Sequence, residues 1–253
     1  MNCTVKQMAA PMSHCEELRE AALICVLGPT ASGKTAFAVR LARSLGVPAE
    51  IISADSRQVY RGMDIGTGKD LCEYGEIPYH LIDIVDAGEQ YNVYRYKEDF
   101  LKAYRSVRER GAVPILCGGT GLYISAVTGN YDFSGNTPLS DPARNSDPYH
   151  TYFIGMLVDR DTRNARIDAR LDARLSEGMV EEIQGLLDAG VPAERLISYG
   201  LEYKFVTKYL LGELDYAQMR DLLAIAIHQF AKRQMTWFRG MERSGIKIHW
   251  TKP

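Results

Sequence analysis

The 253-residue sequence has no apolar run near the roughly 18 residues that a membrane-spanning helix needs. Its five cysteines contain no Cys-x-x-Cys pair, which argues against a zinc site, and their odd number argues against a complete disulfide framework. The first 20 residues lack the apolar centre of a signal peptide. We therefore expect a cytoplasmic protein with a short N-terminal extension, residues 1–20, and no membrane partner.

Strong net charge is absent as well. The formal net charge is −2, so no overall basic field attracts nucleic acid. Positive charge gathers in residues 215–253, where seven Lys and Arg stand against three acids. This local excess fits either an anionic partner or a solvated helix face. The rest of the composition is that of a soluble globular chain, since 46% of the residues are hydrophobic and 25% are charged.

A phosphate-binding loop is the most informative feature that the sequence contains. Residues 28–35 read GPTASGKT, directly after the apolar run 23–27 and before a helix-like stretch that starts at Lys34. In such loops, successive backbone N–H groups and a helix N-terminus hold a polyphosphate. Lys34 adds a positive charge, and the Thr35 hydroxyl can bind Mg²⁺. The loop predicts a phosphorylated ligand, although ATPases, kinases and transferases all use it.

Apolar runs and helical stretches alternate along the chain. Buried strands are expected at residues 23–27, 50–53, 113–117, 152–158 and 246–250, and helices at 34–44, 93–110, 121–128, 160–189 with a break at Gly178, 201–211 and 216–239. This alternation predicts an α/β fold: an open parallel sheet flanked by helices, of the P-loop NTPase type, with a helical C-terminal portion. Residues 21–253 would form one domain, with an irregular Pro- and Gly-containing segment at 132–150.

Two further segments are expected at the carboxyl ends of strands, where ligands of such sheets bind. Asp55 follows the second strand and would face the phosphate-binding loop. From its position alone, Asp55 is either a general base or an indirect partner of Mg²⁺. Gly118-Gly119-Thr120 follows the third strand, where a glycine-rich turn also suits a tight strand-to-helix connection.

Together these segments resemble the tRNA dimethylallyltransferases, also called tRNA isopentenyltransferases. The resemblance covers most of residues 23–132 and 152–250, and the matching stretches are GPTASGKT (28–35), ISADSRQVYRGMDIGTGK (52–69), HLIDI (80–84), PILCGGTGLY (114–123), ARIDARLDARLSEGMVEE (165–182) and AKRQMTWFR (231–239). The family transfers a dimethylallyl group from its diphosphate to N6 of an adenine, which in tRNA lies beside the anticodon. The resemblance therefore implies dimethylallyl diphosphate as donor and an adenine as acceptor.

For the donor, the resemblance implies that the phosphate-binding loop holds the diphosphate, with Lys34 and a Mg²⁺ ion on Thr35 neutralising its charge. Thr30 matches the threonine that contacts the bridging oxygen. Either Arg166 or Arg170, four residues apart on one helix face, would clamp the diphosphate. The implied donor-binding residues are Gly28, Pro29, Thr30, Ala31, Ser32, Gly33, Lys34 and Thr35.

For the acceptor, the resemblance implies that Asp55 is the general base that takes a proton from the N6 amine. The residues that would hold the adenosine are Asp55, Ser56, Arg57, Gln58 and Thr120. The basic stretch 232–239 would approach the tRNA backbone or the diphosphate, while its Trp237 and Phe238 also suit a helix core.

Two departures from the family leave the acceptor open. The helical insertion that grips the anticodon stem-loop has no counterpart between residues 128 and 150, and the later Gly-Tyr-Lys segment reads SYGLEYK at 198–204. Three functions therefore remain: a compact tRNA dimethylallyltransferase, a prenyltransferase for free adenine nucleotides, or an ATP-binding or kinase-like protein. The sequence does not indicate an oligomeric state.

Overall fold

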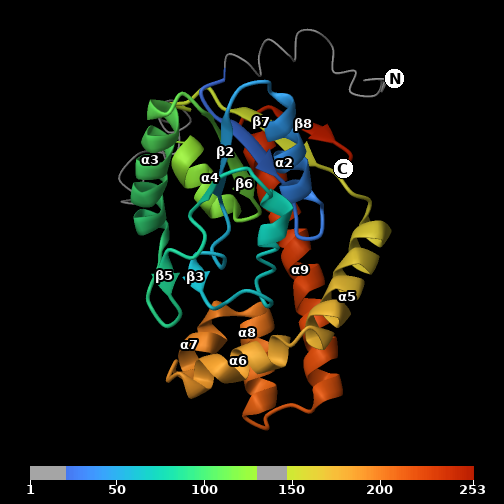
Figure 1. Ribbon diagram of the computed structural model, residues 1–253. Helices are drawn as coiled ribbons and strands as arrows, with labels where there is room; N and C mark the ends of the chain where they lie inside the picture. Colours follow the sequence, from blue (N-terminus) through green and yellow to red (C-terminus); the bar gives the residue numbers. More distant parts are fainter. Residues whose placement is uncertain (1–20, 130–146) are drawn as a thin grey trace, which may run out of the picture.

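Six parallel strands form the central sheet of the computed structural model, which describes residues 21–129 and 147–253 (Figure 1). The strand order is β4-β2-β6-β1-β7-β8. The strands are β1 (Ile24–Leu27), β2 (Ala49–Ser53), β4 (Tyr79–His80), β6 (Val113–Gly118), β7 (Tyr152–Met156) and β8 (Ile248–Thr251). Because β1 pairs with β6 on one side and β7 on the other, the loop after β1 leaves from the centre of the sheet.

Helices cover both faces of this sheet, and the alternation of side chains along β1 shows how. Ile24 and Val26 pack in one core cluster with α2 (Lys34–Ser44). Cys25 and Leu27 pack in the other, with residues of α3 (Val93–Glu109), α4 (Gly121–Thr128) and the C-terminal part of α9 (Tyr216–Arg243). Both faces are apolar, as a buried parallel sheet requires.

A helical portion lies at the end of the sheet toward which the loops after β1, β2 and β6 run (Figure 1). It contains α5 (Arg160–Ser176), α6 (Met179–Asp188), α7 (Ala193–Tyr199), α8 (Leu201–Leu210) and the N-terminal part of α9. Their buried residues, among them Met179, Ile183 and Tyr203, form a third core cluster. The small parallel ribbon of β3 (Tyr60–Arg61) and β5 (Val85–Asp86) packs against this cluster.

The parallel sheet flanked by helices and the helical C-terminal portion are confirmed. The expected break at Gly178 is confirmed too, since α5 ends at Ser176 and α6 begins at Met179, with Gly178 at φ 104°. Tertiary contacts rather than a periodic pattern create the elements that were not predicted: β3, β4, β5, the short 3₁₀ helix η1 (Leu71–Tyr74) and α7. The extension 1–20 and most of segment 132–150 lie outside the described residues.

Two cysteines are buried in the sheet, Cys25 in β1 and Cys117 in β6. Among the helices that the structure describes, none combines the length and apolar character needed to cross a membrane.

Candidate functional site

The loop between β1 and α2 adopts the tight conformation that a phosphate-binding loop requires. Gly33 has φ 75°, a left-handed conformation that favours glycine, and Ala31 is also left-handed at φ 59°. At Gly28, an added Cβ would lie 2.7 Å from Ser32 Oγ and 3.0 Å from the Cβ of Met156. Gly33 is therefore favoured for its left-handed backbone, and Gly28 because a side chain there would clash with Ser32 and Met156.

Gln234 of α9 ties this loop to the turn after β6. Its side-chain oxygen accepts a hydrogen bond from the backbone N–H of Thr30 at 2.8 Å, and its amide nitrogen donates to the carbonyl of Gly119 at 2.9 Å. Gln234 is buried, and a Cβ on Gly119 would lie 2.4 Å from its nitrogen. Gln234 was not among the expected residues, although it lies inside the matching stretch 231–239.

Lys34 begins α2 and lines the cavity in front of the loop. Burial lowers the pKa of its ammonium group below the ordinary lysine value, while the neighbouring Cys117 and Asp55 act in the opposite direction. Within the described residues the ammonium donates no hydrogen bond. A positive charge in this environment is available to an anionic ligand.

The expected acceptor residues come together at the ends of β2 and β6. Asp55 Oδ1 accepts a hydrogen bond from the backbone N–H of Arg57 at 2.9 Å. The Thr120 hydroxyl accepts the backbone N–H of Ser56 at 3.1 Å and donates to the Ser56 hydroxyl at 3.4 Å. The two strand ends approach closely because Gly118 lacks a side chain: its Cβ would lie 2.2 Å from the carbonyl oxygen of Ala54.

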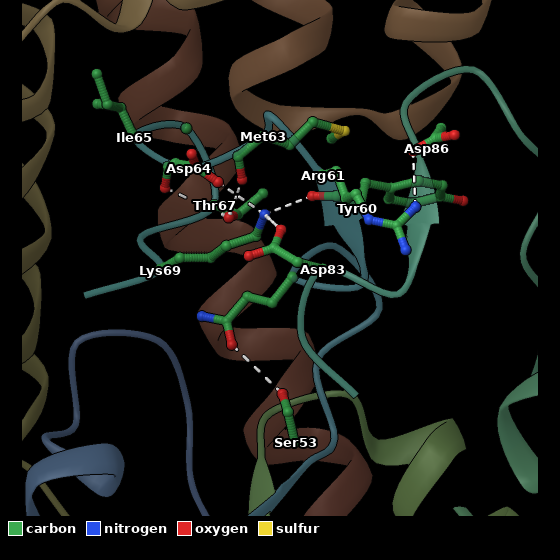
Figure 2. Close-up of polar contacts among 12 residues, drawn as sticks. Ser53, Tyr60, Arg61, Met63, Asp64, Ile65, Thr67, Lys69, Asp83 and Asp86 are labelled. Atoms are coloured by element: carbon green, nitrogen blue, oxygen red, sulfur yellow. Dashed lines mark hydrogen bonds and ion pairs between the residues drawn. The ribbon is translucent and has the colours of Figure 1, made fainter. Parts of the chain in front are cut away.

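The other two expected acceptor residues link this end of the sheet to the rest of the cavity wall. Arg57 Nη1 donates to the carbonyl of Gly200, between α7 and α8, at 3.3 Å. Gln58 accepts from the Ser53 hydroxyl at 3.3 Å and donates to the carbonyl of Gly68 at 3.2 Å. The Ser53 contact is the dashed line at the bottom of Figure 2.

The arginines of α5 separate into two groups. Arg170 lines the cavity and forms an ion pair with Asp70 at 2.7 Å. Arg174 lines it too, with Nη1 3.7 Å from Glu202 Oε1. Arg166 is exposed and is not among the lining residues. Arg174 was absent from the expected residues, although the spacing of four from Arg166 to Arg170 continues to it.

Burial dominates the electrostatics of the deeper Arg174–Glu202 pair. It lowers the pKa of the Arg174 guanidinium, with the charge of Arg170 adding to the effect. It raises the pKa of the Glu202 carboxyl, against the opposing influence of Arg174. The α5 wall of the cavity therefore carries two arginines, each beside an acid, Asp70 or Glu202, that also lines the cavity.

These elements enclose a cavity of about 260 Å³ between the sheet and the helical portion. Its lining includes the following predicted residues: Thr30, Ala31, Ser32, Gly33, Lys34, Thr35, Asp55, Ser56, Arg57, Gln58, Thr120 and Arg170. Gly28 directly follows β1 and Pro29 is the next residue of the loop, but neither is part of the lining. The same cavity therefore holds two cationic groups that suit an anion, those of Lys34 and Arg170. It also holds a carboxylate, a hydroxyl and an amide that suit a polar acceptor, those of Asp55, Thr120 and Gln58.

Comparisons with known proteins assign the chain to a family. The family model described as IPP transferase matches residues 58–148 and 132–241, and the model described as Isopentenyl transferase matches residues 21–74. The tRNA dimethylallyltransferase 1 of Porphyromonas gingivalis is 50% identical over 282 aligned positions, covering 90% of this chain and 93% of the relative. The tRNA dimethylallyltransferase 1 of Azobacteroides pseudotrichonymphae is 48% identical, covering 92% and 94%.

Solved structures give the same result. The tRNA delta(2)-isopentenylpyrophosphate transferase of Staphylococcus epidermidis has a TM-score of 0.80 at 29% identity, covering 91% of this chain and 92% of that one. A eukaryotic dimethylallyltransferase acting on tRNA has a TM-score of 0.77 at 20% identity, covering 91% and 74%, and supports the fold alone. By its sequence matches over most of its length, the chain belongs to the IPP transferase family.

Proposed function

We propose that the protein transfers a dimethylallyl group from dimethylallyl diphosphate to N6 of an adenine in tRNA, beside the anticodon, and releases diphosphate. One observation carries the proposal beyond family membership: the phosphate-binding loop and the Asp55 carboxylate line the same cavity. A donor diphosphate and an acceptor amine can therefore meet there. The names of the relatives as tRNA dimethylallyltransferases support the choice of both substrates.

The donor half of the cavity suits a diphosphate. Loop residues 28–35 and the N-terminus of α2 present backbone N–H groups, and Lys34 supplies a positive charge that hydrogen-bonds to none of the described residues. Arg170, which is paired with Asp70, supplies a second positive charge from α5. Thr30, whose own N–H is held by Gln234, would contact the bridging oxygen that leaves with the diphosphate.

The acceptor half suits an adenine whose exocyclic amine attacks the first carbon of the prenyl chain. A carbon–nitrogen bond forms as the carbon–oxygen bond to the diphosphate breaks, and the electron pair of that bond leaves with the diphosphate. Asp55 takes the proton that N6 releases. Ser56, Arg57, Gln58 and Thr120 would hold the base and its ribose through hydroxyl, guanidinium and amide groups that line the cavity.

A Mg²⁺ ion fits the donor half of the cavity, where oxygens of the diphosphate would bind it. Within residues 21–129 and 147–253, no group of three His, Cys, Asp or Glu side chains is arranged to hold a metal on its own. Mg²⁺ needs no such group, because it is usually held by one or two protein oxygens together with phosphates and water. The Thr35 hydroxyl in the cavity lining supplies such an oxygen. Bound there, Mg²⁺ would neutralise charge on the leaving diphosphate.

A free adenine nucleotide is the second candidate acceptor, and a comparison of chain lengths supports this candidate. The alignment with the P. gingivalis relative spans 282 positions, more than the 253 residues of this chain. The IPP transferase model matches in two pieces that meet within residues 132–148. Both observations support a compact family member that lacks residues of its relatives near that segment, where the resemblance implies an anticodon-binding insertion.

The test is a transfer assay with purified protein, Mg²⁺ and dimethylallyl diphosphate. Unmodified tRNA with adenosine beside the anticodon is offered in parallel with AMP, ADP and ATP, and N6-dimethylallyladenosine is detected by mass. We expect product on tRNA. Product on a nucleotide alone would transfer the assignment to the second candidate, and no product on any of the four acceptors would contradict both.

A further inference from the structure

The carboxylate of Glu182 on α6 gathers four hydrogen bonds from a loop and a neighbouring helix. Oε2 accepts the backbone N–H groups of Asp64 at 2.8 Å and Ile65 at 2.6 Å. Oε1 accepts the backbone N–H of Gly66 at 3.1 Å and the hydroxyl of Tyr203 at 2.8 Å. Three successive N–H groups that converge on one point form a natural anion site, and here a side chain of the protein fills it.

We propose that Glu182 is a positioning residue that fixes the wall segment Gly66–Gly68 of the cavity and, through it, the site of the acceptor adenine. This inference rests on the proposed function for the identity of the acceptor. Glu182 itself is not part of the cavity lining, whereas Gly66, Thr67 and Gly68 are. Any effect of Glu182 on the reaction must therefore pass through the loop that it holds.

The Tyr203 hydroxyl completes the carboxylate site. Tyr203 is fully buried, and burial together with the adjacent Glu182 raises the pKa of its hydroxyl well above the ordinary value, so that the group remains a donor. The ring also sets how close the loop can come, because a Cβ on Gly66 would lie 2.8 Å from the Tyr203 hydroxyl. Only glycine allows the backbone of residue 66 to reach Oε1 in this position.

Lys69 holds the same loop from inside, as Figure 2 shows. Its side chain is fully buried, and its ammonium donates to Asp64 Oδ1 at 2.8 Å, to Asp83 Oδ1 and to the carbonyl of Tyr60. The Thr67 hydroxyl donates to the carbonyl of Met63. Lys69 thus holds the loop at one end and Glu182 holds it on its outer side. These contacts fix the position of the loop surface that lines the cavity.

The wall segment in turn contacts Gln58 of the acceptor half and Arg174 of α5. Gln58, an expected adenosine contact, donates to the carbonyl of Gly68 at 3.2 Å. Arg174 Nη1 lies 3.5 Å from the carbonyl oxygen of Gly66. A shift of the wall therefore changes the position of the Gln58 amide. The phosphate-binding loop is held separately, by Gln234, so diphosphate binding should depend on Glu182 less than acceptor binding does.

The experiment compares Glu182→Gln with Glu181→Gln, a matched control in which the same chemical change is made at the exposed neighbouring residue of α6. An amide at position 182 cannot accept all four hydrogen bonds, because its nitrogen is a donor. Three quantities are measured: amide hydrogen exchange at residues 64–66, the affinity for inorganic diphosphate, and kcat and KM for the acceptor that supports transfer.

For Glu182→Gln we expect amides 64–66 to exchange at least about tenfold faster, since a charge-assisted hydrogen bond is lost in the folded state. The acceptor KM should rise by about tenfold while diphosphate affinity stays within about twofold, because Gln234 and not Glu182 holds the phosphate-binding loop. Tyr203→Phe, which removes one of the four hydrogen bonds, should give a smaller effect in the same direction. Glu181→Gln should match the wild type in all three measurements.

Exchange as slow as in the Glu181→Gln control would overturn the proposal. So would faster exchange with unchanged acceptor kinetics, because Glu182 would then stabilise the loop without positioning the acceptor. An equal loss of diphosphate affinity would also contradict it. If the wild-type protein transfers nothing, the proposed function fails, and the exchange comparison alone decides whether Glu182 holds the wall.

Discussion

The backbone N–H of Thr30 and the side-chain oxygen of Gln234 form a 2.8 Å hydrogen bond across 204 positions of the chain. Through its amide nitrogen, the same buried side chain holds the carbonyl of Gly119. One residue of α9 therefore sets the spacing between the phosphate-binding loop and the turn that carries Thr120. The proposed donor and acceptor residues are brought together by a helix that belongs to neither segment.

Replacing Gln234 by Leu keeps a side chain of similar size but leaves the Thr30 N–H and the Gly119 carbonyl without this partner. We expect a loss of about tenfold in affinity for inorganic diphosphate, measured by calorimetry, because unsatisfied buried groups loosen the loop. Gln184→Leu, at an exposed position of α6, is the control and should bind as the wild type does. Unchanged affinity in Gln234→Leu would show that the phosphate-binding loop keeps its shape without this contact.

Arg166 and Arg170 provide a matched pair, because they lie one turn apart on the same helix and differ in access to the cavity. We expect Arg170→Ala to weaken diphosphate binding by about tenfold or more, the loss of a charge-assisted contact. Arg166→Ala should have little effect, because exposed charges contribute little. The reverse order of effects, measured by the same calorimetry, would show that Arg166 and not Arg170 contacts the diphosphate.

Much of the fold was predictable from the sequence because strands such as β1 and β6 are continuous apolar runs, and because GPTASGKT imposes a strand–loop–helix arrangement. β3, β4 and β5 were not, since each has only two residues and no periodic pattern. The segment that contains them is ordered instead by buried polar contacts such as those of Lys69, which join residues that sequence patterns do not link.

The residues of the candidate site also divide into those that the sequence predicted and those that it did not. Motif residues such as Lys34, in the phosphate-binding loop, and Asp55, after a strand, were placed in the cavity by their position in the pattern. Gln234 and Glu182 were missed because they act on other segments, and a polar residue within a helix does not reveal its partner. Arg174 could have been found, because a spacing of four continues along one helix face.

Gly68 faces the two guanidinium groups of α5. It has φ 64°, and an added Cβ would lie 1.6 Å from Arg174 Nη2 and 2.4 Å from Arg170 Nη2. Gly68→Ala should cost about 1–2 kcal/mol of stability for the left-handed backbone and should also displace Arg170. We therefore expect weaker diphosphate binding as well as a lower melting temperature.

Gly46→Ala separates the two effects of that substitution. Gly46 has nearly the same backbone, φ 70°, with nothing within 4 Å of an added Cβ. This control should lose stability to a similar extent and retain diphosphate affinity. If both variants bind diphosphate equally well, the contact of Gly68 with the arginines has no role in the donor site.

Glu50 in β2 gives a pH-dependent prediction away from the cavity. Hydrogen bonds from Arg110, at 2.8 and 2.6 Å, and from His80, at 2.6 Å, hold the pKa of this carboxyl below its ordinary value. A depressed folded-state pKa contributes stability at neutral pH, which is lost as the pH falls below about 4.5 and through the folded-state pKa.

Glu50→Gln should therefore lower the free energy of unfolding by roughly 2 kcal/mol at pH 7, the size of a charge-assisted hydrogen bond. The difference in unfolding free energy between the variant and the wild type should shrink progressively below about pH 4.5. In that range protonation of the Glu50 carboxyl removes its stabilising contribution in the wild type. A difference that stayed constant down to pH 2, in denaturant titrations, would assign the loss to packing instead of charge.

Asp55→Asn tests the central claim most directly, because an asparagine oxygen can still accept the hydrogen bond from the Arg57 N–H at 2.9 Å and so preserve the turn. The measurement is the single-turnover rate of N6-dimethylallyladenosine formation, together with the affinity for the donor. The account predicts normal donor affinity and a rate lower by about 10²–10⁴-fold, the usual contribution of a general base. A near-normal rate in this variant would contradict the assignment of Asp55 as the base.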